Sequence, residues 1–287
     1  ILISPVQNIL YNINNKKRTK SFIVDGEVFG LKFRSNWNRN YNSPKTSNHT
    51  IQIIYPNIEI KNKSKFENLN EFSTKSQIFY SQDKMNYYLQ FKNNKITISS
   101  PDKENTNFNI NSDIIFKPFY FNGELTIKNK KVEQIIDNFL LNLLSYDENY
   151  LGNFNGKLKI NLDNLNNKLI KGGSIDLIIN EKKIIFKEAK FNLYKIGYIK
   201  SYLSHSFNQG ELKFKTKNLL NIKDHVEFAK IFQVGSNKVK NINKIYFDIE
   251  KISGDSNFII SNVKINNDQN KENSNEIFLV KNIQNLR

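Results

Sequence analysis

Apolar and polar residues alternate with a period of two along much of this chain, and this pattern constrains its fold more than any other feature. Successive side chains of a β-strand point to opposite faces, so each alternating run predicts a strand with one apolar and one polar face. Repeated runs of this kind predict an antiparallel meander. The apolar members of the clearest runs are Phe119, Phe121, Leu125, Ile127, Phe154, Leu158, Ile160, Leu162, Ile175, Leu177, Ile179, Ile184, Phe186, Phe191, Leu193, Leu212, Phe214, Ile245, Phe247, Ile249, Phe258 and Ile260.

Short connections with turn-forming residues separate these runs. Turns are predicted at Asn155-Gly156, Gly172-Gly173, Lys195-Ile196-Gly197 and Gly235-Ser236. Asn122-Gly123 differs because it lies inside a good alternating run, where a glycine indicates that something packs closely against the strand.

Two segments follow helical spacing instead. Residues 131–145 carry an apolar stripe at positions i, i+3, i+4, i+7 and i+8, which is typical of an amphipathic helix. A weaker stripe at about 222–233 contains Val226, Ala229, Ile231 and Phe232. Such helices are expected to cover an apolar sheet face or to close its end. The residues predicted to form the helix cover are Ile135, Ile136, Phe139, Leu140 and Leu143.

The first third of the chain alternates less regularly. Short apolar runs such as Ile51 with Ile53 and Tyr87 with Leu89 predict strands, whereas the polar stretches 34–50 and 61–76 are expected to be loops. The polar composition near 101–107 places a boundary at about residue 112. The predicted regions are therefore 1–112 (strands and loops), 113–265 (the regular β-region) and 266–287 (a polar tail and the start of a further segment).

The composition favours no catalytic or nucleic-acid function. The formal charge is +16, but the excess is nearly all lysine, and the only arginines are Arg18, Arg34, Arg39 and Arg287. Arginine is the residue that prefers bidentate phosphate and guanine recognition, so solvated turn charge is the favoured interpretation. No run approaches the ~18 apolar residues of a membrane span. Any membrane anchor of the parent protein is therefore expected to lie outside this sequence, which we interpret as part of a longer protein.

A catalytic or metal-binding constellation is not apparent. The chain has no cysteine, and its three histidines, His49, His205 and His225, fit no metal-binding motif. The acidic pairs Asp102/Glu104 and Asp147/Glu148 lie in polar, turn-like stretches where an ordinary pKa is expected. We therefore predict no enzyme activity, no cofactor and no metal.

Residues 110–265 resemble the C-terminal part of AsmA-like proteins. The resemblance rests on Phe116-Lys117-Pro118-Phe119-Tyr120-Phe121-Asn122-Gly123-Glu124-Leu125, on the helix pattern that follows, and on 151–160, 173–177 and 248–251. It implies an inner-membrane anchor and a long periplasmic β-sheet folded into a taco-like groove. It also implies a role in moving phospholipid or in supporting outer-membrane assembly. No catalytic residues come with the family.

The expected fold is therefore mainly β, an elongated, curled antiparallel sheet with one or two short amphipathic helices. The expected function is to bind or conduct phospholipid or another acyl-chain ligand along an apolar groove, with no nucleic acid as partner. A structural or adhesin-like β-protein with a packed core is the alternative; a basic nucleic-acid binder and an enzyme rank below it. The residues predicted to line the groove are Phe121, Leu125, Ile127, Leu158, Ile160, Leu162, Ile175, Leu177, Ile179, Phe186, Leu193, Leu212, Phe214 and Phe247.

Overall fold

The computed structural model describes the chain in eleven stretches that fall into two compact units. Unit 1 takes Ile1–Ile127, Asp147–Leu158 and Ile179–Lys183, and unit 2 takes Lys128–Tyr146, Lys159–Ile178 and Ile184–Arg287. The stretches described are 6–28, 31–42, 45–54, 57–68, 71–80, 83–101, 107–131, 155–180, 183–208, 211–252 and 258–265.

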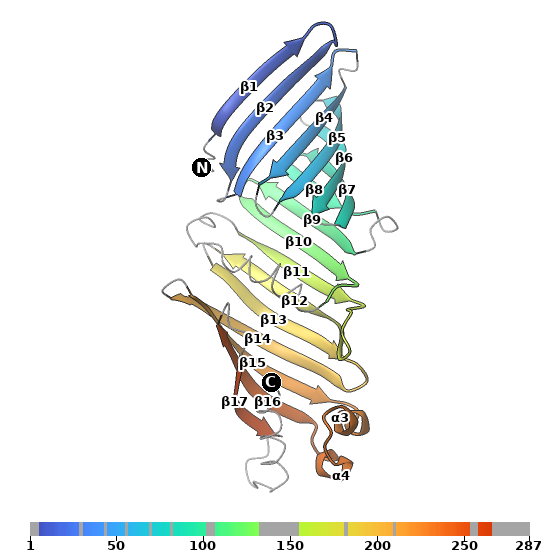
Figure 1. Cartoon of the computed structure of the whole chain (residues 1–287), viewed down its shortest axis with the longest axis vertical. Helices are drawn as coiled ribbons and strands as arrows, with labels where there is room; N and C mark the ends of the chain where they lie inside the picture. Colours follow the sequence, from blue (N-terminus) through green and yellow to red (C-terminus); the bar gives the residue numbers. More distant parts are fainter. Residues whose placement is uncertain are drawn as a thin grey trace. The chain divides into compact units, whose positions relative to one another are not determined.

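Unit 1 is an antiparallel meander in which each strand pairs with the next along the chain (Figure 1). It also contains the first residues of β11. Its strands are β1 (Val6–Asn14), β2 (Thr19–Val28), β3 (Leu31–Asn40), β4 (Thr46–Ile53), β5 (Ile58–Asn68), β6 (Glu71–Tyr80), β7 (Asp83–Lys92), β8 (Lys95–Ser99), β9 (Phe108–Phe116) and β10 (Phe119–Lys128).

Unit 2 continues the same pattern, with β13 to β17 paired antiparallel in chain order. Two short helices lie between β15 and β16 in the sequence. Its elements are β11 (Asn155–Asp163), β12 (Ile170–Asn180), β13 (Lys183–Leu193), β14 (Gly197–Asn208), β15 (Glu211–Ile222), α3 (His225–Ile231), α4 (Ser236–Val239), β16 (Lys244–Ile252) and β17 (Phe258–Ile265).

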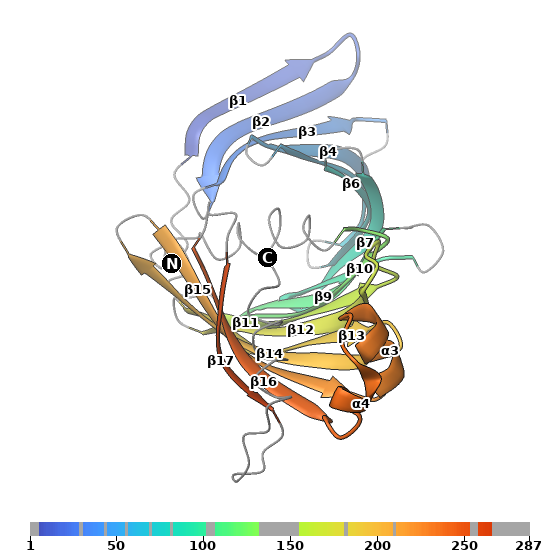
Figure 2. The same cartoon turned by 60° about the horizontal axis from the view of Figure 1, so that its bottom comes forward.

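The expected fold class is confirmed, since the described chain is mainly antiparallel β-sheet with short helices. Within unit 1 the sheet is strongly curved from β2 to β9 (Figure 2). Side chains crowd on the inside of such a curve, and one face of these strands is clearly the less exposed. We call that less exposed face the inner face of unit 1. Residue 112, the expected domain boundary, lies within β9.

The two polar stretches expected to be loops are strands instead. The first contributes to β3 and β4 and the second to β5 and β6, and these strands pair along most of their length. Of the described residues in the first stretch, only Tyr41 and Asn42, after β3, and the residue just before β4 lie in a turn. The prediction was wrong because polar residues occupy both faces here. Ser47 and Thr74, for example, are buried on the inner face, where apolar residues were expected.

Two predicted turns are also strand positions. Gly172 and Gly173 lie inside β12, and Gly156 lies at the start of β11. A Cβ on Gly173 would be 2.2 Å from the carbonyl oxygen of Lys190, so glycine allows a close approach of two backbones here. Gly123 lies within β10 as predicted, with the ring of Phe121 packed over it.

The turn predicted at 195–197 is confirmed, and it joins β13 to β14. Gly197 has a φ of +153°. A Cβ at this position would lie 2.0 Å from the carbonyl oxygen of Asn221. Both the backbone conformation and the contact with β15 therefore require glycine.

Helix α3 begins where Asp224 caps it. The Asp224 carboxylate accepts hydrogen bonds from the backbone N–H groups of Val226 and Glu227, at 3.0 and 2.9 Å. The expected apolar stripe is only half right, because Ala229 is buried whereas Val226 and Ile231 are exposed. Phe228 is fully buried and anchors the helix instead. The helix predicted at 131–145 and the polar tail 266–287 lie outside the described residues, apart from Lys131.

One end of unit 2 is a packed apolar core. Its residues come from the strand ends, from the connections between them and from both helices, and the rings of Phe228 and Phe232 lie 4.6 Å apart. The members of this core are Leu193, Ile196, Leu220, Ile222, Phe228, Ala229, Val234, Val239, Ile242, Ile245 and Ile265.

Replacing Phe228 by alanine should strongly destabilise this core. Truncating a fully buried phenylalanine leaves a cavity and typically costs about 3–5 kcal/mol. Val226→Ala is the matched control, because Val226 is 70% exposed on the same helix; its effect should stay within about 0.5 kcal/mol. Urea denaturation of both variants measures the difference, and equal losses of stability would contradict the packing described here.

Candidate functional site

The inner face of unit 1 carries two apolar rows that run across neighbouring strands. The first joins Ile51, Ile60, Ile78 and Met85, which pair directly in register from β4 to β7. Each of these side chains is half-buried, so part of its apolar surface stays accessible. The second row has the same exposure and extends from β6 to β10 through Phe72, Phe91, Ile96, Ile114 and Phe121.

Aromatic side chains reinforce the second row. The rings of Phe72 and Phe91 are stacked with centroids 5.3 Å apart. The ring centroids of Phe91 and Phe116 lie 6.2 Å apart. Phe116 in turn contacts Phe119 edge-on at 6.2 Å. Contacts of this kind add to the stabilisation that burial alone gives. They fix a continuous aromatic surface along one side of the inner face.

A band of polar residues separates the two apolar rows on β4 to β7, and we call it the polar belt. Part of it pairs His49 with Asn62, Asn62 with Ser76, and Ser76 with Tyr87. The other part pairs Ser47 with Ser64, and Ser64 with Thr74. The members of the polar belt are Ser47, His49, Asn62, Ser64, Thr74, Ser76 and Tyr87.

Hydrogen bonds satisfy only part of the polar belt. Ser35 Oγ lies 2.7 Å from His49 Nε2, and Thr74 Oγ1 lies 3.5 Å from Ser76 Oγ. Within the described residues, Ser47 Oγ and Asn62 Oδ1 have no hydrogen-bond partner. Buried polar groups without a partner are uncommon in folded proteins. Protein atoms cover Ser47, Thr74, Ser76 and Tyr87, so only the half-buried side chains of His49, Asn62 and Ser64 are partly accessible to a bound molecule.

Burial also shifts the ionisation of two belt residues. It lowers the pKa of His49 below its ordinary value of 6.5, because a charged imidazolium would lose hydration there. Burial likewise raises the pKa of Tyr87, and a hydrogen bond with Ser76 opposes this only in part. Both side chains are therefore neutral at pH 7, which keeps the inner face free of charge at this point.

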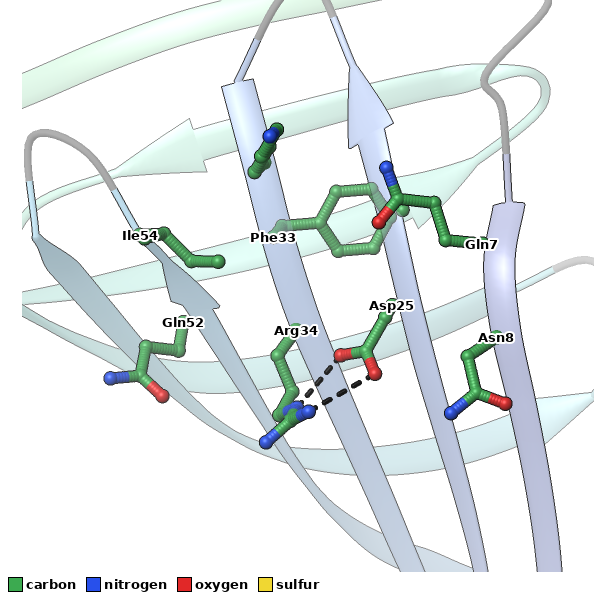
Figure 3. A pocket seen from close by; sticks show the side chains of 9 residues that line it. Gln7, Asn8, Asp25, Phe33, Arg34, Gln52 and Ile54 are labelled. Carbon is green, nitrogen blue, oxygen red and sulfur yellow. Dashed lines mark hydrogen bonds and ion pairs between the residues drawn. The ribbon is translucent and has the colours of Figure 1, made fainter.

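A shallow cleft of about 410 Å³ lies where β1 to β4 approach one another. Figure 3 shows Asp25 and Arg34 facing each other in it, with Arg34 Nε 2.7 Å and Nη2 3.1 Å from the two carboxylate oxygens. The hydrogen bond from Arg34 lowers the pKa of Asp25. The one carboxylate of the cleft is thus already neutralised. The residues that line the cleft are Gln7, Asn8, Asp25, Gly26, Lys32, Phe33, Arg34, Gln52 and Ile54.

The groove lining predicted from the sequence falls into two groups. Phe121, Leu125, Leu158 and Phe247 are half-buried, and the side chain of Leu212 lies outside the described part. Protein atoms already cover the others, so a ligand could reach them only if those atoms moved. The covered residues are Ile127, Ile160, Leu162, Ile175, Leu177, Ile179, Phe186, Leu193 and Phe214. The predicted helix cover lies outside the described residues.

The sequence reasoning missed the accessible apolar rows of unit 1. The runs Ile51 with Ile53 and Tyr87 with Leu89 predict strands, but the polar stretch 61–76 between them is predicted to be a loop. A signal was nevertheless present, because every second residue is apolar again on both sides of the polar interruption. Phe72 and Ile78, for example, stand on either side of Thr74 and Ser76.

The candidates for catalysis are not brought together. His205 packs edge-on against Phe186 at 6.4 Å, and His225 Nε2 lies 3.1 Å from Asn243 Oδ1. Ser35 and His49 are close, but within the described residues no carboxylate orients this histidine as in a catalytic triad. No group of metal-binding side chains occurs in the described part of the chain. The two acidic pairs lie outside it.

Among the described residues, no helix combines the length and the apolar character needed to cross a membrane.

Comparison with known proteins adds no relative: no protein-family model, curated protein or solved structure matches this chain.

The depressed pKa of His49 should make the stability of the protein depend on pH. Between the pKa of His49 in the folded protein and 6.5, the unfolded chain binds more protons than the folded one. The free energy of unfolding should therefore rise with pH through this window and level off above it. Urea denaturation at a series of pH values measures the slope.

Two variants isolate the contribution of His49 to that slope. His49→Gln should flatten it, whereas His225→Gln should leave it in place, because His225 belongs to α3 and not to the polar belt. An unchanged slope in the His49→Gln protein would assign the pH dependence to other groups.

Proposed function

We propose that this chain binds acyl chains along the inner face of unit 1, as an envelope protein of the AsmA-like type. The observation that carries the proposal is the pair of apolar rows, whose side chains are fixed by strand pairing yet only half-buried. A folded protein gains about 25 cal/mol for each Å² of apolar surface removed from water, so a surface of this kind favours an apolar ligand.

The chemistry of the face suits an amphipathic lipid. Methylene groups of an acyl chain match the aliphatic and aromatic side chains of the rows. Of the polar belt, the half-buried side chains of His49, Asn62 and Ser64 match the ester linkages or hydroxyls of a lipid, whereas the other members are covered by protein atoms. Charged groups are absent from the belt itself, and its histidine is neutral at pH 7. Phospholipid is thus a ligand class that the arrangement can accommodate, and periplasmic location with an inner-membrane anchor belongs to the same proposal.

A structural role without ligand is the second candidate, and unit 2 favours it. Apart from the half-buried Leu158, the predicted lining of β11 to β13 is covered, and the end of the unit is a packed core. A β-scaffold whose apolar faces are all sealed by protein would need no lipid. The two functions differ in what they require of unit 1, where an acyl chain either occupies the inner face or does not.

Binding of cis-parinaric acid, whose fluorescence rises in apolar surroundings, tests the proposal. The double variant Ile60→Gln, Ile78→Gln replaces two paired residues of the first apolar row. The loss of apolar contact should weaken binding on the order of tenfold. Leu177 is less suitable for such a test, because a polar residue at a position only 1% exposed would disturb folding itself.

The matched control is Val226→Gln with Ile259→Gln, which makes the same chemical change at two exposed positions of unit 2. It should bind the probe as the unmodified protein does. Native mass spectrometry of the protein purified from cells provides a second readout, with bound phospholipid expected. Equal affinity for both double variants, or no probe binding together with no bound lipid, would rule out the proposal and leave the structural role.

A further inference from the structure

A cluster of lysines and tyrosines surrounds the turn between β13 and β14 in unit 2, and we call it the basic cluster. The ring of Tyr194 lies beneath two ammonium groups, with Lys171 Nζ 5.6 Å and Lys195 Nζ 5.3 Å from its centroid. The ring of Tyr198 is flanked in the same way by Lys190 Nζ at 4.8 Å and by a further lysine, Lys223, at 5.8 Å.

The backbone holds this cluster in a fixed arrangement. The N–H of Tyr194 donates to the carbonyl oxygen of Leu169 at 2.8 Å, which ties the turn to the segment before β12. The N–H of Lys223 donates to the carbonyl oxygen of Ile196 at 2.7 Å, which ties it to the end of β15. Ile196 itself is fully buried in the packed core. The tyrosines and lysines therefore project from a well-supported part of the fold.

The positive charge of the basic cluster is not balanced locally. Within the described residues none of its four lysines forms an ion pair, whereas Lys200 pairs with Glu188 and Lys215 with Glu250 on the same unit. The nearby carboxylate of Asp224 is engaged in capping α3. Tyr194 is 45% exposed beside these cations. The Asp224 carboxylate keeps its negative charge, and Lys171 Nζ donates a hydrogen bond to the carbonyl oxygen of Asn167 at 2.8 Å. The result is a surface with a net positive charge from four lysines and an exposed aromatic ring.

We propose that the basic cluster docks unit 2 onto the surface of a bilayer with anionic headgroups. Lysines near such a surface are attracted by its negative potential. Tyrosine rings prefer the level of the headgroups, where one end is apolar and the other hydrated. Nucleic acid fits less well, because the described residues of unit 2 contain no arginine for bidentate phosphate contacts. This docking goes beyond acyl-chain binding by unit 1 and does not depend on it.

Cosedimentation of the full chain with vesicles tests the docking. Vesicles of phosphatidylcholine with added phosphatidylglycerol should bind the protein, and vesicles of phosphatidylcholine alone should not. Replacing Lys171, Lys190, Lys195 and Lys223 together by glutamine should weaken binding to the anionic vesicles on the order of 100-fold. Added salt should weaken the binding of the unmodified protein, because salt screens the attraction.

The matched control removes the same charge elsewhere. Lys159, Lys187, Lys217 and Lys264 are exposed lysines of unit 2 outside the cluster, and their replacement by glutamine should leave vesicle binding within a few-fold of the unmodified protein. An equal loss in both quadruple variants would overturn the proposal in favour of a general effect of net charge. Tighter binding of a single-stranded oligonucleotide than of anionic vesicles, lost with the cluster, would overturn it in favour of nucleic acid. Parinaric acid binding should be unchanged in the cluster variant, so the two proposals fail separately.

Discussion

The pairing of neighbouring strands is the constraint on which the rest of this structure depends. Once two strands are locked in register, every side chain is assigned to one face or the other and cannot change sides without breaking the ladder. The strands of each unit therefore have a face whose apolar side chains must be shielded from water by other atoms. The two units meet this need differently, and that difference is the basis of the functional argument.

In unit 2 the apolar face is covered by the protein itself. Helices α3 and α4 and the connections around Ile196 complete a packed core with β14 to β17. The side chains of β11 to β13 that were predicted to line a groove are covered as well, except for the half-buried Leu158. In unit 1 the corresponding rows remain half-buried. An apolar ligand is thus most easily accommodated by strands of the first unit, which the sequence pattern had ranked lower.

Polar and charged residues divide their roles between the faces. On the inner face of unit 1 the polar belt is uncharged, and burial keeps His49 neutral. Elsewhere, exposed ion pairs such as Lys92 with Glu71 contribute little to stability because water and salt screen them. The lysine excess of the sequence is therefore best understood as a surface property. At the basic cluster the tertiary arrangement brings four of these charges around two aromatic rings.

Alternation in regular runs was a reliable guide, and interrupted alternation was not. Strands such as β11 and β12 were recognisable because their apolar residues, for example Ile175, Leu177 and Ile179 on β12, repeat without a break. Strands β5 and β6 were missed in part, because serine, threonine and asparagine replace apolar residues in their middle. Glycine was ambiguous for a related reason. At Gly173 it permits two backbones to approach closely, and at Gly197 it follows a turn, although a turn was predicted at both positions.

The sequence by itself determined that the chain is built from antiparallel strands with one apolar face, because side-chain direction on a strand depends only on position. It also determined the end of β13 and the start of β14, where Gly197 is required. Only the tertiary structure decided which apolar faces are covered and which remain accessible, and which lysines gather around Tyr194 and Tyr198. Exposure and clustering depend on residues far apart in the chain, such as Leu169 and Lys223 at the basic cluster, and no local pattern encodes their proximity.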